Sequence, residues 1–181
     1  TSFSFFGDSS DILIKNIKCN TKGLLIKNGN LQIKKDEEIN LQSDFTTQIL
    51  LNKKNVNYYL PIFKNIKFLN QQTNLNGKLN NFLNITFDKT FKVIDYVYTN
   101  KGTIDESFIK LDSPIQNSFL EQKINYLYVK DTNFNARYAL DKKNFVNASG
   151  VYSVNNQVYQ NYNLSNTFSE GTSSINLDFK F

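Results

Sequence analysis

Acidic side chains are the first candidates for chemistry in this chain, because it contains no histidine that could serve as a general base. Asp36, Glu37 and Glu38 are consecutive, and Asp105 is followed by Glu106. Two carboxylates on one surface could act as the acid and base of a glycoside hydrolase. Neighbours on a strand point to opposite faces, however, and both groups lie among polar, turn-forming residues. We interpret them as solvated charges, and expect no catalytic residue and no enzymatic activity.

Metal and cofactor chemistry is not expected either. Cys19 is the single cysteine, so neither an internal disulfide nor a thiolate cluster can form, and a zinc site that includes histidine is excluded. The sequence has no GxxxxGK or GxGxxG phosphate-binding loop and no EF-hand loop. We interpret Cys19 as a small apolar residue at the end of a strand, and we predict no metal and no cofactor.

The charge balance is basic, with a formal net charge of +5 and a pI of about 9.1. Such a balance is compatible with a nucleic-acid partner or with anionic lipid headgroups. Arginine supplies the bidentate contacts to bases and phosphates, and Arg137 is the single arginine. We therefore expect no nucleic-acid partner, and only a modest attraction to anionic lipid.

The elements that position these residues are indicated by alternation of apolar and polar residues along most of the chain. Residues 175–181 place Ile, Leu, Phe and Phe on one side of a strand, with Asn, Asp and Lys on the other. The same period of two runs through residues 39–49 and 134–140. The sequence predicts an all-β protein whose apolar face must be covered by the protein itself, a partner or lipid.

About a dozen strands are expected, arranged as a long antiparallel meander. The Asn–Gly pair at 28–29 predicts a hairpin, and further turns are predicted at 100–102 and at 131. Residues 52–69 have helix-like apolar spacing interrupted by Pro61, so at most one short helix is expected near residues 55–66.

One β domain is expected over residues 1–181. No apolar stretch approaches the ~20 residues of a membrane helix, and no signal peptide is visible. Because the chain begins at Thr1 and has no methionine, we expect it to be a segment of a longer protein.

A set of apolar residues is expected to share the protected face, either as structural core or as the lining of a lipid groove. The set is Ile39, Leu41, Phe45, Ile85, Phe87, Ile109, Leu111, Tyr126, Phe134, Tyr138, Leu177 and Phe179.

Residues 74–82 (NLNGKLNNF), continuing through residues 85–88 (ITFD) to 96–98 (YVY), resemble the AsmA-like family of bacterial envelope proteins, of the AsmA, TamB and YhdP type. In that family a phrase of the form leucine, any residue, glycine, small polar residue, leucine opens successive strands. Residues 147–153 (NASGVYS) and 175–179 (INLDF) look similar.

The resemblance implies a meander curved into an open, taco-like groove, which passes phospholipids between the inner and outer membranes. Its partners would be acyl chains, the two membrane surfaces and envelope proteins at the sheet ends. The chain would be periplasmic and anchored to the inner membrane through a segment outside this sequence. Two acyl chains carry ~30 methylenes at ~0.8 kcal/mol each, so a continuous apolar surface would remove a barrier on the order of 20 kcal/mol.

Two other functions fit the same pattern. An outer-membrane β-barrel would explain the terminal phenylalanine and the many tyrosines, although strand lengths are irregular and Ser43, Thr47 and Asn166 interrupt the apolar faces. An extracellular β-sandwich adhesin or glycan-binding module would use surface Tyr and Asn for stacking and hydrogen bonds. Both stay open as alternatives to the lipid groove.

Overall fold

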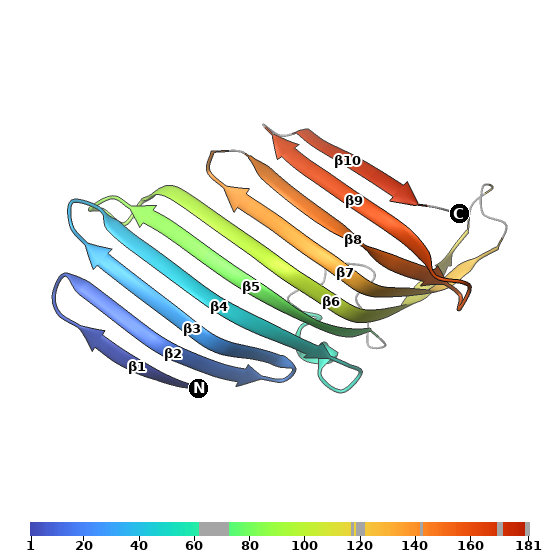
Figure 1. The fold of residues 1–181 in the computed structure, drawn as a ribbon, viewed down its shortest axis with the longest axis horizontal. Helices are drawn as coiled ribbons and strands as arrows, with labels where there is room; N and C mark the ends of the chain where they lie inside the picture. Colours follow the sequence, from blue (N-terminus) through green and yellow to red (C-terminus); the bar gives the residue numbers. More distant parts are fainter. Residues whose placement is uncertain (62–72, 117, 119–121, 142, 170–171, 180–181) are drawn as a thin grey trace.

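The computed structural model describes residues 1–61, 73–116, 118, 122–141, 143–169 and 172–179. Ten strands pair in sequence order into one antiparallel sheet, with β1 and β10 at its two edges (Figure 1). The strands are β1 (Ser2–Gly7), β2 (Asp11–Thr21), β3 (Leu24–Lys35), β4 (Ile39–Leu51), β5 (Asn74–Phe87), β6 (Val93–Ile115), β7 (Ile124–Ala139), β8 (Asn144–Val154), β9 (Gln160–Ser169) and β10 (Thr172–Phe179). Pairing in sequence order confirms the predicted all-β antiparallel meander, and the sheet is open, as predicted.

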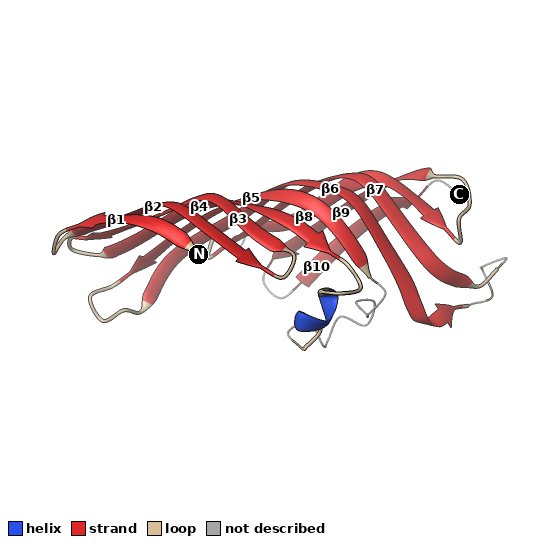
Figure 2. Cartoon of the chain, turned by 90° about the horizontal axis from the view of Figure 1, so that it is seen from below, coloured by secondary structure: helices blue, strands red, loops and turns tan. Residues whose placement is uncertain are grey.

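A short 3-10 helix, η1 (Val56–Tyr58), lies on the concave side of the curved sheet (Figure 2). The Tyr59 hydroxyl, directly after η1, donates a hydrogen bond to the carbonyl oxygen of Thr21 at 2.8 Å. It also lies 2.9 Å from the Thr21 hydroxyl. These contacts attach the residue after η1 to the C-terminal end of β2. The single short helix expected near residues 55–66 is thus one 3-10 turn, and residues 62–66 lie outside the described residues.

The strands are longer and fewer than predicted, because two predicted turns are β-bulges. Asn28 and Asp131 lie inside β3 and β7 with positive φ of 54° and 49°, and the pairing register shifts at both. Asn and Asp tolerate this left-handed backbone in a bulge as well as in a turn. The predicted hairpin at 28–29 was wrong, since β3 pairs with β2 on one side and β4 on the other. The predicted turn at 100–102 was also wrong, because β6 continues through it.

Over the described residues the sheet is a single layer. Substantial contacts between elements join only neighbouring strands. The accessible surface of 12099 Å² exceeds the ~9,000 Å² expected for a compact 21.0 kDa monomer. Few apolar side chains are buried in this part of the chain, namely Val56, Ala136, Ala139, Ala148 and Tyr152. Most apolar side chains therefore keep some exposure to their surroundings.

Candidate functional site

One face of the sheet is apolar from β2 to β10. Residues directly opposite each other in an antiparallel pair share a face, so the pairing register allows one row to be followed across nine strands. This row carries no charged side chain. It consists of Cys19, Ile26, Thr47, Leu79, Gly102, Phe134, Ala148, Leu164 and Leu177. We name the face that contains this row the apolar face.

The opposite face of the same strands is polar. The row one residue further along each strand consists of Lys27, Thr46, Asn80, Lys101, Asn135, Asn147, Ser165 and Asn176. We name this side the polar face. The sheet is therefore amphipathic across its width, as the period of two in the sequence predicts.

Nine of the twelve predicted lining residues share the apolar face. Ile39 lies opposite Phe87, and Leu41 lies opposite Ile85, so these side chains are direct cross-strand neighbours. Leu177 is 51% exposed, and most of the others are half-buried. The nine are Ile39, Leu41, Phe45, Ile85, Phe87, Ile109, Phe134, Tyr138 and Leu177.

The other three residues have different outcomes. Leu111 follows Lys110 at a shift in the register between β6 and β7, and no strand pair fixes its face. Tyr126 lies on the polar face, opposite Lys110, and its ring centre is 6.0 Å from that of Phe108. It is an even number of residues from Phe134, but the extra residue of the bulge at Asp131 exchanges the faces between them. Phe179 is paired with Tyr162 at the end of β10, and its side chain is outside the described part of the structure.

The apolar face also includes residues that the predicted set lacks. Ile12 and Ile14 of β2 lie opposite Ile33 and Leu31 of β3, and Leu31 is in turn opposite Ser43. Their alternation is visible in the sequence, so the signal that could have identified them was the same one used for β4. The pairing register shows that Ile12 and Ile14 extend the apolar face from β4 through β3 to β2, next to the edge strand β1.

A buried polar cluster interrupts the apolar face on β5 and β6. Asn81 is 6% exposed, and its amide nitrogen donates to the Phe45 carbonyl oxygen at 3.2 Å. The Asn81 Oδ1 accepts hydrogen bonds from the Tyr98 hydroxyl at 2.8 Å and from the Asn100 amide at 2.7 Å. Asn100 is 9% exposed, and its Oδ1 has no partner within the described residues. A satisfied cluster fixes β5 against β6, while the leftover acceptor costs desolvation energy.

The residues considered for catalysis are not gathered into a site. Asp36, Glu37 and Glu38 form the exposed turn between β3 and β4. Glu106 lies 3.7 Å from Lys130 in an exposed ion pair. No cluster of three metal-ligating side chains occurs among the residues that the structure describes, and none of its helices has the length and apolar character to cross a bilayer.

Comparison with known proteins adds no relative. No protein-family model, no curated protein and no solved structure matches this chain. The functional argument therefore depends on the two faces of the sheet.

Proposed function

We propose that the apolar face holds phospholipid acyl chains and shields them from water during transport between the inner and outer membranes of a bacterial envelope. The single observation that carries this proposal is the uncharged row that crosses β2 to β10 in one layer. Apolar patches of this extent on a protein surface usually meet another apolar surface. Acyl chains match it because they are apolar along their whole length and need no specific polar contact.

The energetics favour movement along the sheet. Each methylene that leaves water for the apolar face gains ~0.8 kcal/mol. A chain that moves from one strand to the next exchanges one apolar contact for an equivalent one, so the barrier between positions is small. The charged headgroup can stay hydrated beside the open sheet, which avoids the cost of burying it.

Under this proposal the chain works in the periplasm as one segment of a longer β-groove protein, which a segment outside this sequence anchors to the inner membrane. Both β1 and β10 have an unpaired edge in the described sheet. Exposed strand edges are usually paired, covered or charged. Further strands of the same protein, or envelope proteins, would complete these edges next to each membrane.

Lipid content of the purified chain tests the proposal. Leu41→Asp places a charge on the apolar face, whereas Gln42→Asp places the same charge one residue along β4, on the polar face. We expect phospholipid to co-purify with the parent chain and with Gln42→Asp, and to fall at least fivefold in Leu41→Asp. Circular dichroism is used to check that both variants keep the β-sheet.

Two outcomes would reject lipid binding. Parent protein that is repeatedly free of phospholipid and forms a dimer through its apolar face would assign that face to a second copy of the chain. Equal lipid content in folded Leu41→Asp and Gln42→Asp variants would place the acyl chains elsewhere.

A further inference from the structure

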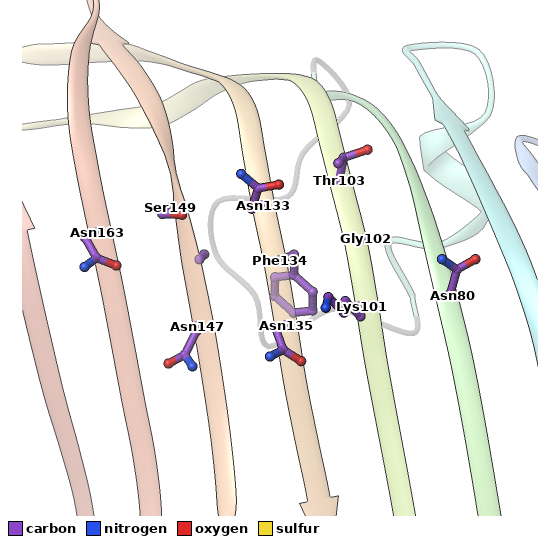
Figure 3. A pocket seen from close by; sticks show the side chains of 11 residues that line it. Asn80, Lys101, Gly102, Thr103, Asn133, Phe134, Asn135, Asn147, Ser149 and Asn163 are labelled. Carbon is purple, nitrogen blue, oxygen red and sulfur yellow. The ribbon is translucent and has the colours of Figure 1, made fainter.

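The polar face contains a hollow of about 380 Å³ over the middle of the sheet (Figure 3). The residues around it come from β5 to β9, and pairing places eight of the eleven in two neighbouring rows of the polar face. The other three, Gly102, Phe134 and Ala148, belong to the row between these two. The first row is Asn80, Lys101, Asn135 and Asn147, and the second is Thr103, Asn133, Ser149 and Asn163. Strand spacing puts these groups on a grid of ~4.8 Å across the strands and ~6.8 Å along them.

The polar side chains of this hollow offer neutral hydrogen-bonding groups. Five of the residues that line it are asparagines, and Lys101 is the single ionisable one among them. Each amide carries two donor hydrogens and an acceptor oxygen, and the hydroxyls of Thr103 and Ser149 both donate and accept. A ligand hydroxyl has the same dual character. A strongly anionic ligand would instead need several cations, and Arg137 is already paired with Asp141.

Two of these amides, those of Asn135 and Asn147, are free to bind, unlike other asparagines of the polar face such as Asn80, which accepts a hydrogen bond from the Thr46 hydroxyl at 2.9 Å. Asn40 accepts a hydrogen bond from Thr86 at 2.9 Å, and Asn30 donates to Asp44 at 3.1 Å. Within the described part of the chain, no side-chain hydrogen bond satisfies Asn135 or Asn147. The Asn147 Oδ1 is in addition shielded from solvent. A buried acceptor without a partner costs free energy. The amide nitrogen of Asn147 is the group that we expect to donate to a ligand.

Two phenylalanines lie on the same face in the row next to the hollow, although they are not among the residues that line it. Phe82 lies two residues from Asn80 on β5, and Phe145 lies two residues from Asn147 on β8. Both are half-buried, and the register places them in one row through Thr99 and Arg137. An aromatic ring offers a flat apolar surface beside the hydrogen-bonding groups. Sugar rings present the matching pair of surfaces, with hydroxyls at the edge and C–H groups on the face.

We propose that the hollow on the polar face binds a neutral oligosaccharide that lies across β5 to β9. The amides of Asn135 and Asn147 bind its hydroxyls, and Phe145 packs against a sugar ring. This site does not depend on acyl-chain binding, because the two ligands would occupy opposite faces of the sheet.

Titration of the full chain with defined oligosaccharides tests this site. The probes are the hexasaccharides of β-1,4-glucose, α-1,4-glucose and β-1,4-N-acetylglucosamine, followed in ¹H–¹⁵N spectra. We expect at least one probe to shift the side-chain amide signals of Asn135 and Asn147. Asn147→Ala should weaken that probe at least tenfold, and Asn135→Ser provides a second, milder variant. Asn84→Ala is the matched control, because Asn84 is exposed on the same face outside the hollow.

The affinities of the parent chain, the two variants and the Asn84→Ala control decide whether oligosaccharide binds in the hollow. Absence of shifts with all three probes at millimolar concentration would overturn the proposal. So would equal affinity of parent, Asn147→Ala and Asn135→Ser, or shifts centred on Asn84. The lipid content of Asn147→Ala should equal that of the parent chain, so a failure here is distinguishable from a failure of acyl-chain binding.

Discussion

At the residue scale, Arg137 and Asp141 close the turn between β7 and β8 with a bidentate ion pair. The Arg137 Nη1 lies 2.8 Å from Asp141 Oδ1, and Nη2 lies 2.7 Å from Oδ2. The same guanidinium donates to the Lys143 carbonyl oxygen at 2.8 Å. Because the single arginine is used in this way, its position supports a structural role rather than recognition of phosphate.

The acid stability of this turn follows from the pair. Hydrogen bonds from Arg137 and from the Lys143 backbone lower the pKa of Asp141 from 3.8 to about 2. A lowered folded-state pKa gives stabilisation that is present above the unfolded pKa and is lost as the pH falls through about 2. We predict a carboxyl ¹³C titration midpoint for Asp141 near 2, and a midpoint that moves toward 3.8 in Arg137→Gln. An unchanged midpoint in that variant would show that arginine is not the cause.

At the element scale, the close approach of β5 and β6 depends on glycine. A Cβ at Gly102 would lie 2.0 Å from the Lys78 carbonyl oxygen and 2.9 Å from the Leu79 Cα. A Cβ at Gly77 would lie 2.6 Å from the Thr103 carbonyl oxygen. These are backbone atoms, so they can make room only if one strand moves away from the other.

Gly102→Ala should therefore destabilise the sheet by about 2 kcal/mol or more in urea unfolding, because it forces β6 away from β5. Thr103→Ala is the matched control, since that side chain is exposed on the polar face one residue away. It should change the free energy of unfolding by less than about 0.5 kcal/mol. Equal midpoints for the two variants would mean that the strands are not closely packed at Gly102.

The limits of prediction from sequence also lie at this scale. Period-two alternation predicted the strands, their antiparallel order and the shared face of residues such as Leu41 and Phe87. It could not separate bulges from turns, because Asn28 and Asp131 suit the left-handed backbone of either. An undetected bulge also explains why Tyr126 was assigned to the wrong face. The polar hollow was missed because asparagine is abundant throughout the chain, and only the strand register brings Asn135 beside Asn147.

At the scale of the whole molecule, the sheet is a single curved layer (Figure 2). The pairing register gives this layer one apolar and one polar face. Stability arises between neighbouring strands, since no second layer packs on the described strands. This arrangement leaves the apolar face available to acyl chains and the polar face available to water and to oligosaccharide. The central claim of the proposed function is that hydrocarbon contacts the first of these faces and not the second.

Photo-crosslinking along β4 tests that claim most directly. A benzophenone amino acid is placed singly at each position from 41 to 46, the chain is loaded with phospholipid and irradiated, and lipid adducts are measured by mass spectrometry. Odd positions share the apolar face and even positions the polar face. We predict adducts at 41, 43 and 45, with few or none at 42, 44 and 46. Equal adducts on both sets of positions, or adducts only at the even ones, would contradict an acyl-binding apolar face.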